Sequence, residues 1–385
     1  MIPTTTRWLH DEDAQRVCRV VQDGGHHIYF VGGCVRDALL GLPDSDVDLS
    51  TDAPPETVMA LAKAAGVKAV PTGIEHGTVT LVSGGTPFEI TTFRRDVETD
   101  GRRAVVRFSK DIAEDARRRD FTMNAIYATP EGRVIDPLGG LPDLHARRLR
   151  FIEDANQRIQ EDYLRTLRYF RFMAWYGDPS DGPEPEALHA IASNLDGLET
   201  LSAERVGQEV KKLLCAPDPA PALALMRQTG VLPVLLPGSD DRWMSMLVHF
   251  EQGLGLSPDW LCRLAALGGD DLTNRLRLSK AEGKRLTVLQ EQGIAGPPLP
   301  ELAYRHGVDV ARAAALLRGC VAEQMSESSV LETIDAAAAA RFPITAKDLM
   351  PQFNGPELGQ ELARLEQLWI ASGFTLDRVE LLGGR

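Results

Sequence analysis

The chain has 385 residues, carries a formal net charge of −13 at pH 7, and is 25% charged and 43% hydrophobic. This length exceeds what one ordinary core organises, so several structural units are expected, and the composition is that of a globular protein. No apolar run reaches the ~18 residues that a membrane helix needs. The first residues, MIPTTTRWLHDED, lack the basic and then apolar segments of a secretory signal.

The positions of the cysteines and arginines narrow the class of protein further. The five cysteines lie far apart and form no C-x-x-C pair, which indicates reduced thiols in a cytoplasmic protein and argues against a cysteine-built zinc site. The acidic net charge argues against a nucleic-acid binder, but 17 of the 42 basic residues lie between Arg94 and Arg171, and 16 of these 17 are arginines. Arginine suits bidentate contacts to phosphates and bases, so this segment can bind a polyanion. A solvated charged surface is the alternative.

Residues 11–150 alternate between strand and helix patterns. Strands are predicted at HIYFVGG, SDVDLST, HGTVTLV and TPFEITTF, and helices at CVRDALLG and PPETVMALAKAAG. From about residue 152 onward, helical patterns replace the strand patterns. We therefore predict an α+β fold, in which a mixed α/β head over residues 1–145 is followed by all-α domains over residues 146–215, 216–291 and 292–385.

Two aspartates lie one residue apart in the predicted strand SDVDLST. Side chains at i and i+2 of a strand point to the same face, so Asp46 and Asp48 can share divalent cations. Mg²⁺ prefers one or two carboxylates completed by phosphate oxygens, and two such ions support in-line displacement of pyrophosphate. Gly32 and Gly33 let the backbone approach a triphosphate, and Arg36 supplies fixed positive charge.

The whole stretch VGGCVRDALLGLPDSDVDLST resembles the nucleotidyltransferase superfamily of DNA polymerase beta. More narrowly, it resembles the class II tRNA nucleotidyltransferases (CCA-adding enzymes) and bacterial poly(A) polymerases. The resemblance implies a polymerase-beta-like head followed by a helical neck, body and tail, in the four spans given above. It also implies that Asp46 and Asp48 are catalytic and hold Mg²⁺. Glu89, in the strand TPFEITTF, is a candidate third carboxylate, and an ordinary strand residue is the alternative.

The stretch RRRDFTMNAIY (117–127) resembles a second family motif, RRDFTxNA. The resemblance implies that Arg119 contacts the incoming nucleotide, while Asp120 and Asn124 brace the junction and the sugar. From its residue type alone, Asp120 could instead cap a helix. The polar segment 94–111 is predicted as a charged loop, and the family carries a flexible loop there that is implicated in the switch from adding C to adding A.

The stretch RIQEDYLRTLRYFRF (158–172) is predicted as one helix, in which Arg165, Arg168 and Arg171 flank an apolar stripe. Repulsion among these three charges predicts an anion between them. Asp162 and Arg165 stand three residues apart, and together they offer an acceptor and a donor. Cytosine and adenine share the complementary edge, whereas uracil and guanine present the opposite polarity and would leave buried polar groups unpaired. An intrahelical salt bridge is the alternative.

The same stretch resembles the EDxxR motif of the family, a protein template that replaces a nucleic-acid one. Glu161, Asp162 and Arg165 match this motif, and the resemblance implies that Arg168 and Arg171 bind the nucleotide phosphates. The predicted nucleotide-binding residues are therefore Gly33, Arg36, Arg119, Glu161, Asp162, Arg165, Arg168 and Arg171.

These motifs predict an RNA nucleotidyltransferase that adds C, C and A to the tRNA 3′ end from CTP and ATP. The stretch TGIEHGTVTLV (72–82) favours the tRNA enzymes over poly(A) polymerases, which tend to be basic there. A CC-only enzyme and a poly(A) polymerase remain alternatives. A metal-dependent phosphohydrolase would need dispersed His and Asp ligands, but the only His-Asp dipeptide is His10-Asp11; a non-catalytic RNA-binding protein would be expected to lose the aspartates. The helical domains are expected to hold the tRNA acceptor and T-arm, and no membrane or protein partner is implied.

Overall fold

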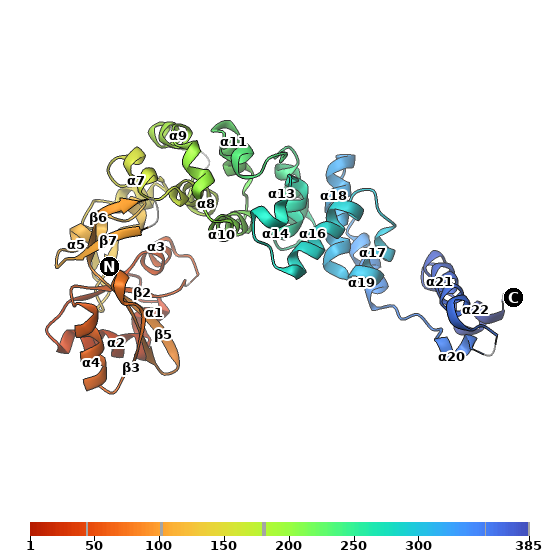
Figure 1. The fold of residues 1–385 in the computed structure, drawn as a ribbon, viewed down its shortest axis with the longest axis horizontal. Coiled ribbons are helices and arrows are strands. Elements are labelled where there is room, and N and C mark those ends of the chain that lie inside the picture. Colours follow the sequence, from red (N-terminus) through yellow and green to blue (C-terminus); the bar gives the residue numbers. More distant parts are fainter. Residues whose placement is uncertain (44, 101–102, 179–181, 351, 384–385) are drawn as a thin grey trace. The chain divides into compact units, whose positions relative to one another are not determined.

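The computed structural model describes residues 1–43, 45–100, 103–178, 182–350 and 352–383 (Figure 1). The chain forms two compact units, one of residues 1–209 and 221–235, the other of residues 210–220 and 236–385. Helix α10 (Ala203–Leu214) contributes residues to both units. The four domain spans predicted from the sequence stay a prediction.

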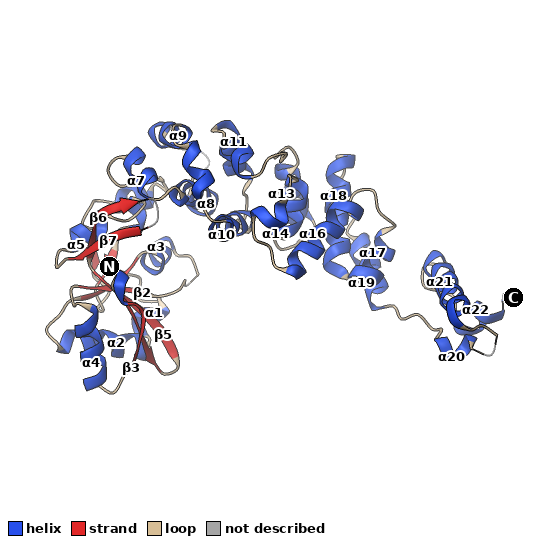
Figure 2. Cartoon of the chain, in the orientation of Figure 1, coloured by secondary structure: helices blue, strands red, loops and turns tan. Residues whose placement is uncertain are grey.

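Strands occur only in the first unit, as far as the described residues go (Figure 2). Seven of them form one sheet in the order β3-β4-β5-β2-β1-β8-β9, in which β2 and β5 run parallel and the other neighbours antiparallel. Because β2 is central, its two ends are fixed by neighbours on both sides. The strands are β1 (Ile28–Val31), β2 (Asp48–Thr51), β3 (Lys68–Gly73), β4 (Thr78–Ser83), β5 (Thr86–Thr92), β8 (Tyr127–Ala128) and β9 (Val134–Ile135).

The sheet is held by alternating apolar side chains and by helices that begin at recognisable caps. Val79 and Leu81 on β4 and Phe88 and Ile90 on β5 are buried, as expected for strands with one covered face. Asp11 caps α2 by accepting the backbone N–H of Ala14. The helical segments of this unit are α1 (Arg7–His10), α2 (Glu12–Asp23), α3 (Gly33–Leu40), α4 (Pro55–Ala64), η1 (Ile74–His76), α5 (Ile112–Arg117), η2 (Thr122–Asn124), α6 (Leu141–His145), α7 (Ala155–Glu161), α8 (Leu164–Tyr176), α9 (Pro185–Ala192), η3 (Leu195–Thr200), α11 (Ala220–Gln228) and α12 (Val231–Leu235).

The segment 94–111, predicted as a loop, is mostly a hairpin. Strands β6 (Arg94–Asp100) and β7 (Arg103–Phe108) pair antiparallel and form a separate two-stranded sheet. The prediction of a loop was wrong because the segment's many charges hid a pairing between two short strands, which composition does not reveal.

The second unit is helical throughout its described residues. One core joins α17, α18 and α19 through buried apolar residues such as Leu302, Ala314 and Ile334. A second core holds the C-terminal helices through the buried side chains of Leu365 and Trp369, against which Leu358 and Leu362 pack. The helices are α13 (Met244–Gly253), α14 (Trp260–Leu267), α15 (Leu272–Arg275), α16 (Lys280–Gln292), α17 (Leu299–His306), α18 (Val308–Ala322), α19 (Ser329–Ala339), α20 (Ala346–Leu349), α21 (Gly355–Ala371) and α22 (Arg378–Gly383).

A buried ion pair closes the end of α10 within the second unit. Arg263, 1% exposed, pairs with Glu251 at 2.6 Å and also donates to the carbonyl oxygens of Leu214 and Ala216. These bonds satisfy carbonyl groups that a helix end leaves without intrahelical partners. Among the described helices, none combines the length and apolar character that crossing a membrane requires.

Candidate active site

A glycine turn opens the candidate site at the end of β1. Gly32 has φ 72°, a left-handed conformation that favours glycine, and α3 begins at the next residue. The Nη1 atom of Arg119 lies 3.6 Å from the position that a Cβ on Gly32 would take, and Nη2 of Arg36 lies 3.7 Å from the corresponding position on Gly33. The turn therefore brings two predicted arginines to the backbone of the two predicted glycines.

The two aspartates lie beside this turn, but only one belongs to a strand. Asp48 is the first residue of β2, whereas Asp46 lies in the preceding loop, so the prediction that both project from one strand was wrong. Strand pairing starts only at Asp48, which stands opposite Val31 of β1. Both aspartates are exposed, and no side chain in the described part of the chain bonds either carboxylate.

Glu89, the third candidate carboxylate, is the partner of Asp48 in the parallel pairing of β2 and β5. Residues opposite each other in neighbouring strands share a face of the sheet, so the two carboxylates lie on the same face. Partial desolvation and then the negative charge of Glu89 raise the pKa of Asp48; Arg119 opposes this shift and Asp46 adds to it. The like charges make this edge of the sheet a place that favours a cation.

The donor set suits a hard divalent ion. Asp46 and Asp48, with Glu89 on the neighbouring strand, offer only carboxylate oxygens, which Mg²⁺ prefers. No group of three or more His, Cys, Asp or Glu residues that could hold a metal ion occurs within the described ranges. A site with so few protein ligands would draw further ligands from a nucleotide, as Mg²⁺ commonly does.

Arg119 is oriented by a buried carboxylate on α5. Asp115 has no exposed side-chain surface and accepts hydrogen bonds from Arg118 at 2.8 Å, Arg119 at 3.1 Å and the Tyr127 hydroxyl at 2.8 Å. Burial alone would raise its pKa, but Arg119 and Arg118 lower the pKa of Asp115 to about 2. Two guanidinium groups share this one carboxylate, which leaves surplus positive charge next to Gly32.

Arg36 is anchored from three directions. It donates to Asp37 at 2.8 Å, to the side-chain oxygen of Asn124 at 2.8 Å and to the Tyr176 hydroxyl at 2.7 Å. Its guanidinium also lies 4.0 Å from the centroid of the Tyr176 ring. Arg36 is buried, so these contacts fix the orientation of a charge that the sequence placed on the helix but could not orient.

An aromatic side chain on α8 gathers three of the predicted arginines. The guanidinium carbons of Arg36, Arg168 and Arg171 lie 5.0, 5.4 and 4.5 Å from the ring centroid of Phe172. Distances under ~6 Å allow a cation–π attraction, which offsets part of the repulsion among the three charges. Phe172 is buried, and it joins α3 of the head to α8.

Carboxylates balance the arginines of α8. Arg168 bonds Asp120 at 2.7 Å, and Arg171 bonds Glu209 at 2.6 Å. The repulsion that predicted an external anion is therefore relieved within the chain. Asp120 also accepts from Asn124 at 3.0 Å and from the Phe121 backbone, so it braces the junction without capping a helix in its own segment.

The predicted helix over 158–172 is interrupted at the base-reading motif. Helix α7 ends at Glu161, Asp162 takes an extended conformation with φ −154°, and α8 begins at Leu164. One oxygen of Asp162 accepts the Leu164 backbone N–H at 3.1 Å, as an aspartate does at a helix start. A single continuous helix was therefore wrong, because Asp162 competes for the backbone that would have continued it.

Asp162 and Arg165 do not pair with each other. Arg165 bonds Glu161 at 2.7 Å, and Asp162 bonds Arg205 of α10 at 2.7 Å. The intrahelical salt bridge considered as an alternative is therefore replaced by two separate pairs. Each of the two predicted base-reading groups has its own partner.

Several residues of this site were not predicted from the sequence. Asp115 stands three and four residues before two arginines of the RRRD stretch, and Phe172 and Tyr176 stand one turn apart on α8, so spacing could have indicated these. Arg205 and Glu209 lie more than one helix away, and nothing local in the sequence indicates their partners.

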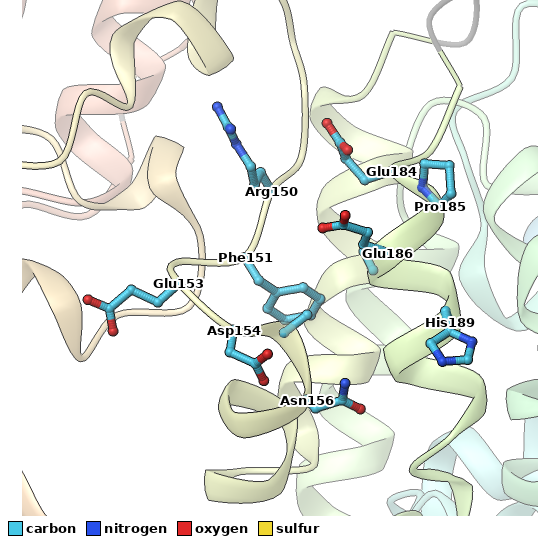
Figure 3. A pocket seen from close by; sticks show the side chains of 11 residues that line it. Arg150, Phe151, Glu153, Asp154, Asn156, Glu184, Pro185, Glu186 and His189 are labelled. Atoms are coloured by element: carbon cyan, nitrogen blue, oxygen red, sulfur yellow. The ribbon is translucent and has the colours of Figure 1, made fainter.

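A separate pocket of about 440 Å³ lies between the 150–156 segment and the start of α9 (Figure 3). Glu153, Asp154, Glu184 and Glu186 contribute carboxylates to its lining. None of the predicted site residues lines this pocket, and its acidic character is unsuited to a triphosphate.

The glycine turn and the exposed aspartates at one mixed sheet, together with the arginines that α3 and α8 contribute, define a nucleotidyltransferase head. Consistent with this class, residues 28–150 match the poly(A) polymerase head domain family, and residues 183–242 match a probable RNA- and SrmB-binding site of polymerase A. The polymerase beta superfamily to which such heads belong generally uses divalent metals.

Relatives identify the family within that class. The mitochondrial CCA tRNA nucleotidyltransferase 1 of Mus musculus is 32% identical over 97% of this chain and 90% of its own length. The CCA-adding enzyme of Levilactobacillus brevis is 32% identical over 92% of each chain. The crystal structure of the Bacillus stearothermophilus CCA-adding enzyme in complex with CTP superimposes with a TM-score of 0.76, at 28% identity, covering 94% of this chain and 93% of that one. The chain belongs to the class II CCA-adding enzymes, which are RNA nucleotidyltransferases.

Proposed function

We propose that the chain adds C, C and A to the 3′ end of tRNA from CTP and ATP without a nucleic-acid template. The observation that carries the proposal is the exposed pair Asp46 and Asp48 beside a glycine turn next to which the guanidinium groups of Arg36 and Arg119 lie. The names of the relatives, which span nearly the whole chain, support CCA addition to tRNA, and the CTP complex of the similar structure supports CTP as a substrate.

In this proposal Asp46 and Asp48 are the catalytic carboxylates and would hold Mg²⁺, and Glu89 is the candidate for a further ligand. Bound magnesium supplies activation of the attacking hydroxyl and neutralisation of the leaving pyrophosphate. The backbone at Gly33 and the side chains of Arg36 and Arg119 orient the α-phosphate for in-line attack by the tRNA 3′-hydroxyl.

The arginines of α8 hold the rest of the triphosphate. Arg168 and Arg171 are already oriented by Asp120 and Glu209, so little side-chain freedom is lost when a nucleotide binds. Their guanidinium groups retain donors beyond those used in these bonds, because each guanidinium has five N–H groups.

Base selection is assigned to Asp162 and Arg165. The carboxylate accepts the exocyclic amine of cytosine or adenine, and the guanidinium donates to the neighbouring ring nitrogen. Glu161 contributes by holding Arg165 at 2.7 Å and does not itself read the base. Because the two readers are oriented independently, the edge they present does not depend on a bond between them.

The remaining assignments follow from the same proposal. The head spans 1–145, the neck 146–215, the body 216–291 and the tail 292–385, and the helical parts bind the tRNA acceptor and T-arm mainly through shape and phosphate contacts. We place the protein in the cytoplasm on the strength of its free cysteines. The names of several relatives state a mitochondrial location for those proteins.

One incorporation assay tests the proposal. A tRNA that lacks CCA is supplied with CTP and ATP, separately and together. Growth by three nucleotides only when both are present, and by two with CTP alone, is the expected result. A stop after two nucleotides with both present would indicate a CC-only enzyme, a long A tail would indicate a poly(A) polymerase, and no growth would refute the proposal.

A further inference from the structure

The carboxylate of Asp162 is held at both of its oxygens. Oδ1 accepts the backbone N–H of Leu164 at 3.1 Å, and Oδ2 accepts from Nη2 of Arg205 at 2.7 Å. The first bond comes from the start of α8 and the second from α10, more than forty positions later in the chain. The two bonds together set the plane of the carboxylate, which one bond alone would leave free to rotate.

The backbone under this carboxylate is packed tightly. The ring of Tyr163 fills the space beside Gly197, where an added Cβ would come within 1.9 Å of a ring carbon. The break between α7 and α8 is therefore fixed in position by a side chain next to Asp162. The remaining freedom of Asp162 is the rotation of its carboxylate, and Arg205 is the side chain that restricts it.

The second predicted base reader is oriented without Arg205. Arg165 donates to Glu161 at 2.7 Å, to the Arg158 carbonyl at 2.9 Å and to the Arg118 carbonyl at 2.8 Å. A change at Arg205 should therefore disturb only the acceptor half of the edge that Asp162 and Arg165 present to a base.

We propose that Arg205 is a positioning residue for base selection, which orients Asp162 so that its remaining lone pairs face the exocyclic amine of cytosine or adenine. The inference rests on the proposed function. A carboxylate has about four lone-pair sites, of which Leu164 and Arg205 use two. A carboxylate free to rotate could also accept the ring N–H of uracil or guanine, and discrimination against these bases would fall.

The ion pair between Asp162 and Arg205 is poorly explained by a contribution to folding stability alone. The side chains of Asp162 and Arg205 are 30% and 29% exposed, and ion pairs with this degree of solvent contact contribute little to folding. The guanidinium is planar and directs its donors in a fixed fork, so it defines an angle as well as a charge. Lysine at this position would keep the charge and lose most of the angular definition.

The experiment measures kcat/KM for CTP and for UTP at the first addition to a tRNA that lacks CCA, using the full chain. Arg205→Ala should lower the CTP/UTP ratio about tenfold, and Arg205→Lys should restore part of that loss. Lys211→Ala is the matched control. Lys211 lies on α10, as Arg205 does, and this change removes its 2.8 Å ion pair with Glu282 of α16 without touching Asp162. The CTP/UTP ratio of this variant should equal that of the wild type. Asp162→Ala removes the accepting carboxylate completely and gives the CTP/UTP ratio expected without it.

Each outcome separates this inference from the proposed function. An unchanged ratio in Arg205→Ala, together with a lost ratio in Asp162→Ala, would overturn the role of Arg205 and leave the proposed function intact. Faster incorporation by Arg205→Ala at an unchanged ratio would also overturn it, because Arg205 would then restrain Asp162 without orienting it. If Asp162→Ala keeps the wild-type ratio, the assignment of Asp162 as a reader fails as well. If the wild type adds no nucleotide, the proposed function itself fails.

Discussion

The two halves of the candidate site balance their charges in opposite ways. At the glycine turn, Asp46 and Asp48 are exposed and lack side-chain partners among the described residues. Partial desolvation, and then the nearby charges of Glu89 and Asp46, raise the pKa of Asp48. On α8, Arg168 and Arg171 each have a carboxylate at 2.7 Å or less. The two aspartates therefore have no side chain bonded to their carboxylates, whereas the two arginines of α8 already have carboxylate partners without any ligand.

This difference indicates which half is built for an incoming ion and which for precise geometry. Burial alone would raise the pKa of Asp120, but Arg168 and hydrogen bonds from Asn124 and the Phe121 backbone lower it to about 2. The pKa of Asp48 is therefore raised, whereas the pKa of Asp120 is lowered. A group that awaits a cation is left unpaired, while a group that orients an arginine is paired in advance.

The largest expected effect comes from removing one unpaired carboxylate. Asp48→Asn keeps the shape of the side chain and removes the charge, so we expect nucleotide incorporation to fall by at least about 10³-fold. Single-turnover addition of CTP measures the loss, and a filter-binding assay should show tRNA binding close to that of the wild type. Asp23→Asn, the same change at another exposed carboxylate of the head, is the control. Incorporation retained by Asp48→Asn would remove Asp48 from the metal site.

The base-reading arginine provides the next effect. Arg165→Ala removes the donor half of the edge that reads the base, and discrimination of CTP against UTP should fall by up to about 100-fold. The ratio of kcat/KM values measures this loss, because a general loss of activity would lower both values together. A ratio that does not change would assign base selection to other groups, and Arg165 would then serve only to tie Glu161 to two backbone carbonyls.

A third prediction concerns the paired half of the site and its dependence on pH. Asp120 has a pKa of about 2 in the folded chain and about 4 when unfolded, so its pairing stabilises the fold fully above pH 4 and is lost as the pH falls toward 2. Asp120→Asn should therefore lower the free energy of unfolding at pH 7 by about 2 kcal/mol. Urea unfolding at pH 7 and at pH 3 measures the difference, which should be smaller at pH 3. An equal difference at both pH values would contradict the shifted pKa.

Much of the head could be predicted from the sequence because its signals are local. The strand that ends at the glycine turn, the helix that carries Arg36 and the hairpin of β4 and β5 follow from alternation and turn residues. Strands β8 and β9 were missed because they are only two residues long, and β3 was missed because Pro71 and Gly73 interrupt it.

The site shows the same division between local and distant information. The type and spacing of Asp46, Asp48, Asp162 and Arg165 indicated their chemistry. The break between α7 and α8 at Asp162 was missed because the helical spacing of apolar residues continues across it. One residue with an extended backbone does not change that spacing. Glu209 and Arg205 of α10, the partners of Arg171 and Asp162, lie 38 and 43 positions away from them, and pairing over such separations depends on tertiary packing.

The smallest effect tests how the two halves are joined. Tyr176→Phe keeps the ring under Arg36 and removes the hydroxyl that accepts its 2.7 Å hydrogen bond. One such bond is worth about 1 kcal/mol, so KM for CTP should rise about fivefold while the CTP/UTP ratio stays at the wild-type value. Phe172→Leu, which removes the ring shared by three arginines, should raise KM at least as much. If either change altered the ratio and left KM alone, the aromatic residues would belong to base selection, and the paired half of the site would not be the part that holds the triphosphate.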